Sequence, residues 1–135
     1  MITSSSAEVV REFFGAFGAG DRDRIIATFH PEAQIVAVRS AVRNAGELYG
    51  RYAGTAGVND FVTTLGQTFV TQAFAIDGVV GDGSVAFASG SFIHVVKSTG
   101  RAFTSDWALR CVIKDGKIFE YRFFEDSAAF VDATR

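Results

Sequence analysis

The first apolar positions of the chain recur at helical spacing. Val9, Phe13 and Phe17 follow one another every four residues. Because an α-helix turns once in about 3.6 residues, this spacing places the three side chains on one face. Ser5-Ser6-Ala7-Glu8, just before them, has the form of a capping box. The pattern therefore predicts an amphipathic helix from about Ser5 to Phe17.

Two further short helices are expected before the strands. Asp21 can cap a second helix that carries Phe29 and ends at Pro31. Thr55 can cap a third helix, whose apolar residues share one face: Val58, Phe61, Leu65 and Phe69. The stretch from Ser40 to Gly54 shows no period, so we expect it to be a loop.

The second half of the chain alternates apolar and polar residues, as half-buried strands do. The alternating runs predict an antiparallel meander of four strands: Gln72–Val80, Ser84–Lys97, Ala102–Lys114 and Lys117–Phe124. A weaker alternation from Ala33 to Arg39 indicates one earlier strand. Helices followed by hairpins predict an α+β fold, and a chain of 135 residues suits a single domain, 1–135.

Two registers are open to the last hairpin. If Lys114-Asp115-Gly116 is a three-residue loop with a bulge, Arg110 faces Glu120 and one face is almost wholly apolar. A two-residue Asp-Gly loop would set Leu109 against Arg122, because a one-residue slip exchanges the faces. We therefore expect the bulged register, with these residues facing the helices: Trp107, Leu109, Cys111, Phe119, Tyr121 and Phe123.

The preceding hairpin decides where His94 points. With Ser98-Thr99-Gly100 as a bulged loop, Ser89 and Ser91 join the inner face and His94 points away. A two-residue Thr-Gly loop would instead bring His94 inward beside Ser105. We expect the first arrangement.

Composition limits the possible functions. Fourteen of the residues are Phe, which indicates a large core or an aromatic-lined cavity. The formal charge is −2 and there is no basic stripe, which argues against nucleic-acid binding. No apolar run reaches the roughly 20 residues of a membrane span, and Met1-Ile2-Thr3-Ser4 does not open a signal peptide, so we expect a cytoplasmic protein. A lone Cys111 forms no internal disulfide. Without phosphate-loop or metal-ligand spacing, we expect neither cofactor nor metal.

Three segments spread over the chain occur in the order and spacing of one known family. They are Gly18-Ala19-Gly20-Asp21, the stretch from Tyr52 to Val58, and the tail from Trp107 to Ala129. Together they resemble ketosteroid-isomerase-related proteins and their SnoaL-like branch. The resemblance implies the cone-shaped fold of nuclear transport factor two, in which a curved antiparallel sheet wraps around N-terminal helices. It also implies a pocket between helices and sheet, and commonly a homodimer.

The catalytic positions of that family do not carry over to this chain. The carboxylate base of the isomerases falls near Ala37, their oxyanion-hole Tyr on Phe13 and their protonated Asp near Leu109. The Arg and two Asp of related epoxide hydrolases fall near Ser89, Ser91 and Phe123. Because the family includes isomerases, cyclases, dehydratases, epoxide hydrolases and non-catalytic binders, its fold alone selects no function.

Four side chains remain as candidates for catalysis. His94 is the best general base if it points inward. Glu125 follows Phe123 by two positions, so alternation places it on the same inner face, where an apolar rim of the cavity would raise its pKa. Tyr121 can orient a ligand, and Arg39 can hold an anion or a carbonyl at the cavity mouth. Each also has a structural alternative, as a solvated residue at a strand end or a phenol bonded to the backbone.

The aromatic wall suits a small, apolar, oxygenated molecule such as a polyketide or terpenoid. We expect it to contact these residues: Phe13, Phe17, Ile35, Ala37, Tyr52, Phe61, Leu65, Ser89, Ser91, Trp107, Leu109, Cys111, Phe119 and Phe123. A cyclase, isomerase or lyase is expected, with a non-catalytic binding or dimerising module and an epoxide hydrolase as alternatives. Convergence of His94, Glu125 or Arg39 on the cavity, with a hydrogen-bond partner, would favour the enzyme.

Overall fold

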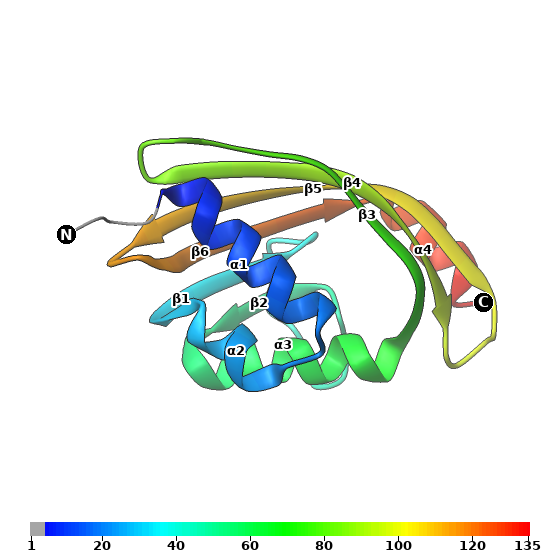
Figure 1. Ribbon diagram of the computed structural model, residues 1–135. Helices are drawn as coiled ribbons and strands as arrows, with labels where there is room; N and C mark the ends of the chain where they lie inside the picture. Colours follow the sequence, from blue (N-terminus) through cyan, green and yellow to red (C-terminus); the bar gives the residue numbers. More distant parts are fainter. Residues whose placement is uncertain (1–4) are drawn as a thin grey trace.

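A six-stranded sheet curves around the N-terminal helices in the computed structural model, which describes residues 5–135 (Figure 1). The expected absence of a signal peptide concerns residues 1–4 and lies outside the described residues. The strand order is β2-β1-β6-β5-β4-β3. The strands are β1 (Phe29–Ala37), β2 (Gly50–Ala53), β3 (Phe69–Asp82), β4 (Val85–Val96), β5 (Ala102–Lys114) and β6 (Lys117–Glu125). The predicted α+β cone is confirmed, and within its otherwise antiparallel sheet β1 runs parallel to β6.

Four helices accompany the sheet: α1 (Ser6–Gly18), α2 (Arg22–Ala27), α3 (Gly54–Thr68) and α4 (Ser127–Ala133). Three of them begin at a side-chain cap, as expected for α1 and α2. Ser5 Oγ accepts from Glu8 N at 3.2 Å, and the carboxylates of Asp21 and Asp126 accept from backbone N–H groups at 3.2 and 3.0 Å. Each such cap is worth about 1 kcal/mol, because it satisfies an N–H without an intrahelical partner. No helix of residues 5–135 has the length and apolar character to span a membrane.

The structure corrects three predicted boundaries. The second helix ends at Ala27, and both Phe29 and Pro31 belong to β1. Pro31 is tolerated there because the β1–β6 pairing shifts register between Phe29 and Gln34, where a missing N–H breaks no regular ladder. The expected loop before the third helix contains the short strand β2. Thr55 lies inside α3, which begins without a side-chain cap.

Apart from Phe119, the residues of the last hairpin that were predicted to face the helices do so, but by a different register. Lys114 pairs with Lys117, and positive φ angles at Asp115 (55°) and Gly116 (73°) form the two-residue turn that the sequence argument rejected. A bulge at Phe119 then shifts the pairing by one more residue, so that Leu109 pairs with Phe123 and both lie on the predicted inner face. The predicted pairing of Arg110 with Glu120 is wrong, because Arg110 lies opposite Arg122.

The predicted register of the preceding hairpin is also wrong. His94 pairs with Phe103 and is buried, whereas Ser89 lies on the outer face and Ser91 on the same side. The inner face of β4 carries Ala86, Ala88, Gly90, Phe92, His94 and Val96. Both faces of this strand hold apolar residues, so the alternation could not decide between them.

Helix packing leaves one part of the concave face open. Helix α1 crosses the inner side of β3 to β6, and α3 covers β1 and β2 (Figure 1). Helix α4 packs on β5 at the opposite end, where Phe130 contacts Phe69 and Phe103. Between the end of α1, the side of α3 and the bend of β3, the side chains enclose a cavity rather than a filled core.

Candidate functional site

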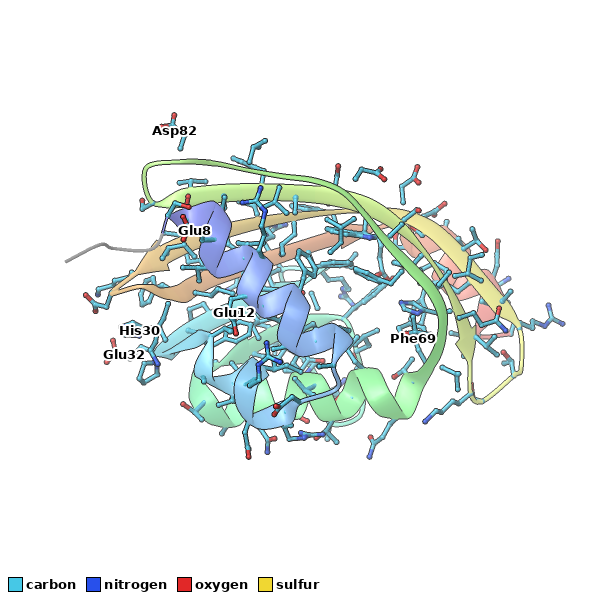
Figure 2. The ribbon with its side chains drawn as sticks, viewed as in Figure 1. Glu8, Glu12, His30, Glu32, Phe69 and Asp82 are labelled. Carbon is cyan, nitrogen blue, oxygen red and sulfur yellow. The ribbon has the colours of Figure 1, made fainter. Side chains whose placement is uncertain are left out.

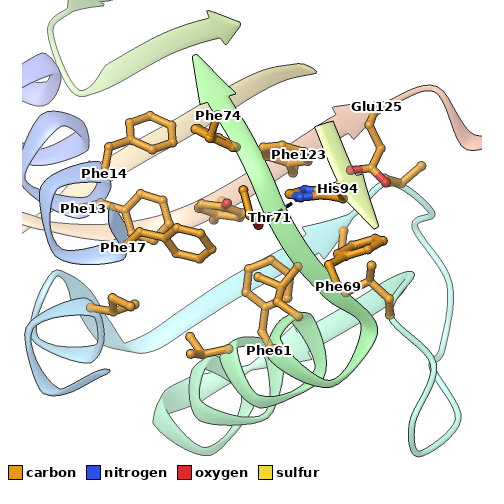
Figure 3. Close-up of a pocket in the computed structure, with 18 of the residues that line it drawn as sticks. Phe13, Phe14, Phe17, Phe61, Phe69, Thr71, Phe74, His94, Phe123 and Glu125 are labelled. Atoms are coloured by element: carbon orange, nitrogen blue, oxygen red, sulfur yellow. Dashed lines mark hydrogen bonds between the residues drawn. The ribbon is translucent and has the colours of Figure 1, made fainter. Parts of the chain in front are cut away.

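An aromatic cavity of about 260 Å³ lies between the helices and the sheet. Seven phenylalanines line it: Phe13, Phe14, Phe17, Phe61, Phe69, Phe74 and Phe123 (Figure 3). Its lining residues Gly20, Arg22, Gly66 and Thr71 are exposed and mark the mouth. Such walls suit apolar molecules, and any chemistry at the cavity would fall to the few polar side chains that reach it.

The carboxylate of Glu125 faces the cavity from the end of β6 (Figure 3). The hydroxyl of Tyr49, from the segment before β2, donates to Glu125 Oε2 at 2.6 Å. Burial raises the pKa of Glu125 to about 7, against the lowering effect of the Tyr49 hydrogen bond. Burial, followed by the charge of Glu125, raises the pKa of Tyr49, so this phenol remains a donor. Near pH 7, Glu125 can both take up and return a proton.

An arginine clamp holds Tyr49 in place. Arg43 pairs with Asp60 of α3, and its guanidinium lies 4.1 Å above the centre of the Tyr52 ring. Tyr52 in turn donates to the Leu48 carbonyl at 2.6 Å. These contacts fix residues 38–49 against α3, so that Leu48 and Tyr49 reach the cavity.

Tyr121 presents a phenol to the same cavity. Its ring packs between Phe13 and Phe61, at centroid distances of 5.4 and 5.6 Å. Burial is the main cause that raises its pKa, followed by the charges of Cys111 and Glu125, so the hydroxyl keeps its proton. Within residues 5–135 this hydroxyl has no protein hydrogen-bond partner, which leaves it as a donor for a ligand.

A second polar pair stands on the β3–β4 side of the cavity. His94 Nδ1 lies 3.0 Å from Thr71 Oγ1, and its ring stacks between Phe69 and Phe92 at 4.5 and 4.0 Å (Figure 3). Burial lowers the pKa of His94 to about 4, so the imidazole is neutral at pH 7. A neutral ring with one nitrogen bonded to Thr71 leaves the other for a ligand oxygen.

Comparison with known proteins identifies the family. The SnoaL-like domain matches residues 10–121. The chain belongs to the SnoaL-like family. The structural neighbours share the nuclear transport factor two-like fold with this chain, and no curated protein matches it.

Three solved structures illustrate how closely this SnoaL-like fold is shared. A nuclear transport factor two-like protein of Burkholderia xenovorans has a TM-score of 0.82 at 22% identity, over 100% of this chain and 99% of its own. A protein assigned as a SnoaL-like polyketide cyclase of a Jannaschia species gives 0.81 at 18%, over 98% and 93%. TerC, crystallised with polyporic acid, gives 0.80 at 20%, over 97% and 98%. At these identities the likeness shows the fold alone.

Nine of the residues predicted for the site line the cavity of this SnoaL-like protein. Three were candidates for catalysis and six for ligand contact: His94, Glu125, Tyr121, Phe13, Phe17, Ala37, Phe61, Leu65 and Phe123. Seven of them lie on the inner face of β6 or on the apolar faces of α1 and α3, whereas Ala37 comes from β1 and His94 from β4. Whether they act on a ligand stays a prediction.

Arg39 lies outside the cavity. Val38, a β-branched residue at φ 63°, ends the strand in a tight turn in which Arg39 N donates to the Ala37 carbonyl at 2.7 Å. The Val38 N–H also donates to the Phe123 carbonyl at 2.9 Å. The turn breaks the alternation, so Val38 lines the cavity and Arg39 is exposed.

The other predicted contact residues lie elsewhere. Ile35, Tyr52, Trp107, Leu109 and Cys111 are buried on the inner side but do not line the cavity. Alternation gives the face of a sheet and not the position along the strand, so it cannot separate cavity from core. Burial raises the pKa of the Cys111 thiol to about 12, which keeps it protonated.

Three predicted residues lie away from the inner face. Ser89 and Ser91 are on the outer face because of the register of β4. Phe119 sits at the bulge of β6 and packs on His30 and under the Lys114 ammonium. His30 lies at the start of β1, at the end of the molecule opposite to Phe69 (Figure 2).

Sequence reasoning missed the partners that complete both polar pairs. The hydrogen bond of Tyr49 to Glu125 joins residues 76 positions apart in the sequence, so no local pattern indicates it. Thr71 fell just before the predicted start of β3, so its face was not assigned. In residues 5–135 no three His, Cys, Asp or Glu side chains gather as metal ligands. The chemistry of this cavity therefore centres on Glu125, Tyr121 and His94.

The two shifted pKa values predict opposing effects of pH on stability. Glu125 has a raised pKa of about 7, so its contribution is full below the usual 4.5 and is lost as pH rises through 7. His94 has a lowered pKa of about 4, so its contribution is full above the usual 6.5 and is lost as pH falls through 4. Between pH 4.5 and 6.5 the two effects oppose each other.

Glu125→Gln should therefore expose the effect of His94. We expect the free energy of unfolding of this variant to rise from pH 4.5 to 6.5 by about 1–2 kcal/mol more than that of the wild type. Urea unfolding at several pH values measures the slope. Glu120→Gln, at an exposed position on the outer face, is the matched control and should keep the wild-type slope. Equal slopes in Glu125→Gln and the wild type would show that Glu125 is not perturbed.

Proposed function

We propose that this SnoaL-like protein is an enzyme that moves a proton on an apolar, oxygenated small molecule, as a cyclase, isomerase or lyase does. The observation that carries the proposal is the carboxyl of Glu125 at an aromatic cavity, bonded to Tyr49, with a pKa of about 7. A general base works best when its pKa lies near the working pH. In water a carboxylate of ordinary pKa is a much weaker base.

The residues suit proton transfer next to a carbonyl group. The Glu125 carboxylate takes a proton from the carbon beside the carbonyl, and the C–H electron pair forms a C=C bond. The carbonyl π pair moves to oxygen, where the Tyr121 hydroxyl donates a hydrogen bond to the developing enolate. Protonated Glu125 then returns its proton to another carbon. Alternatively, the enolate carbon attacks a second carbonyl carbon of the same molecule, whose π pair moves to its oxygen, and that oxygen takes the proton from Glu125. The aromatic walls keep water away from these steps.

Small, mostly apolar ligands suit the volume and lining of the cavity. About 260 Å³ lies just under the common range of roughly 300–1000 Å³ for ligand pockets. Neighbours named as polyketide cyclases, another as an isomerase, and TerC with polyporic acid support a cyclic, oxygenated substrate. His94 and Thr71 add a second place where an oxygen of the ligand can bond.

A non-catalytic binding module would need only the apolar walls. Two titratable groups converge here on the cavity, Glu125 with Tyr49 and His94 with Thr71, and this favours the enzyme. Burying such groups costs stability, and a pocket that only binds apolar molecules does not need them. Epoxide hydrolysis would use the same carboxylate on a water molecule, but it gives Tyr121 no enolate to stabilise.

Hydrogen exchange on a simple ketone tests the proposal. The protein should speed the exchange of the protons beside the carbonyl of 4-phenylcyclohexanone in deuterium oxide, followed by proton NMR. We expect Glu125→Gln to lower the catalysed rate about 100-fold or more, and Tyr121→Phe about 100-fold. Because the carboxylate is the active form, kcat/KM should rise with pH through about 7 and then level off.

Glu120→Gln again serves as the control, because this carboxylate is exposed on the outer face, and it should exchange at the wild-type rate. An exchange rate equal to that of buffer, or one that Glu125→Gln leaves unchanged, would refute the proposed base.

A second copy of the chain is the proposed partner for the outer face of the sheet. Val80 and Phe87, paired across β3 and β4, are 66% and 51% exposed, and Phe124 of β6 is exposed on the same face. Large apolar side chains gathered on one open face mark an interaction surface. Such a face on each of two copies can be buried by one symmetric contact, as the family resemblance implies.

Phe87→Glu should convert the proposed dimer to monomers. It would place a charge in the apolar contact, while the exposed position leaves the fold intact, as circular dichroism can verify. Size-exclusion chromatography with light scattering gives the mass. Val42→Glu, at a position 92% exposed on the segment before β2, should remain dimeric. A monomeric wild type would refute the dimer.

A further inference from the structure

One buried hydrogen-bond donor beside the cavity has no acceptor. Trp107 is 3% exposed, and its indole Nε1 has no hydrogen-bond partner within residues 5–135. Buried polar groups in native proteins are nearly always bonded, so an unpaired one calls for an explanation. An indole N–H only donates, so what is missing is an acceptor.

Three rings that line the cavity surround the indole. The Trp107 ring stacks nearly parallel with Phe74 and Phe123, at 5.1 and 5.6 Å and interplanar angles of 19° and 18°. Phe14 is tilted against it at 5.2 Å. The N–H lies in the plane of the indole, so it cannot point at the face of either stacked ring. Because Phe14, Phe74 and Phe123 also line the cavity, the indole lies directly behind the cavity wall.

Phe74 is the part of that layer best able to move. It is 36% exposed and lies on β3, an edge strand that is paired on one side only. The pairing of β3 with β4 is irregular on both sides of Phe74, between Thr71 and Ala73 and between Ile76 and Gly78. Edge segments with interrupted ladders open at low cost compared with the interior of a sheet. Phe14 and Phe123, by contrast, are held between α1 and β6.

We propose that the cavity has a further subsite at Trp107, where an oxygen acceptor of the ligand takes the indole N–H once the Phe74 ring turns aside. The ligand class is an apolar ring compound with a carbonyl, quinone or ether oxygen. Trp107 pairs with Glu125 across β5 and β6, so the bonded oxygen is held on the same side as the carboxylate. The subsite rests on the proposed binding of an apolar oxygenated molecule and not on proton transfer.

The single Trp of the chain makes the subsite directly observable. In ¹⁵N-labelled protein it gives one indole N–H signal, and the Ile25 methyl signals report whether the cavity is occupied. The probes are 4-phenylcyclohexanone and phenylcyclohexane, which differ by one carbonyl group. We expect the ketone to move the indole proton downfield and slow its exchange with solvent, whereas the hydrocarbon should move only the Ile25 signals.

Two substitutions separate the hydrogen bond from the shape of the site. Trp107→Phe removes the donor and keeps an aromatic ring, and should lower the preference for ketone over hydrocarbon about fivefold. Phe74→Ala opens the route and should raise the affinity for the ketone. Val70→Ala, on the outer face of the same strand, should change neither.

The outcomes also separate this inference from the proposed function. Ketone binding that moves the Ile25 signals but not the indole signal overturns the subsite and leaves the proposed function standing. An unchanged preference in Trp107→Phe overturns the subsite as well. If neither probe moves the Ile25 signals, both the subsite and the proposed binding fail. Indole bonding without hydrogen exchange on the ketone supports the subsite and counts against the base.

Discussion

The proposed chemistry of this protein depends on the burial of one carboxyl group at an aromatic cavity. Glu125 ends β6 beside Phe123, at a cavity whose walls offer a carboxylate little solvation. The hydrogen bond from Tyr49 only partly replaces water. A carboxyl group in such surroundings holds its proton until about neutral pH. The curved sheet, the helices and the Arg43 clamp can all be understood as the scaffold that keeps Glu125 in this place.

Much of the fold could be predicted because it follows from local periods. The helical spacing of α1, the caps at Ser5 and Asp21 and the boundaries of β5 depend on residues close together in sequence. The inner face of the last hairpin was also predicted, although its register was not. The two-residue turn and the one-residue bulge at Phe119 together move the pairing two residues away from the predicted register, and a shift of two leaves the side chains beyond the bulge on their predicted face. The face on which a side chain lies could therefore be inferred more safely than its partner on the neighbouring strand.

The site was less predictable because distant segments build it. Alternation along β6 predicted that Glu125, Tyr121 and Phe123 face the cavity. It gave no sign of Tyr49, which reaches Glu125 from a loop that the Arg43–Asp60 pair fixes. The length of the short loop after β4 sets the register of this strand. Because both faces of β4 carry apolar residues, the alternation did not reveal the register, and His94 was assigned to the wrong side. The positive φ of Val38 turned Arg39 outward, and a β-branched residue gives no warning of such a turn.

Titration of Glu125 tests the account most directly. Carbon-13 NMR of the side-chain carboxyl, assigned by comparison with Glu125→Gln, follows its ionisation from pH 3 to 9. The account predicts a midpoint of about 7, and a still higher one in Tyr49→Phe, which removes the hydrogen bond that favours the carboxylate. A midpoint near the usual 4.5, unmoved by Tyr49→Phe, would show a solvated surface carboxylate and contradict the account.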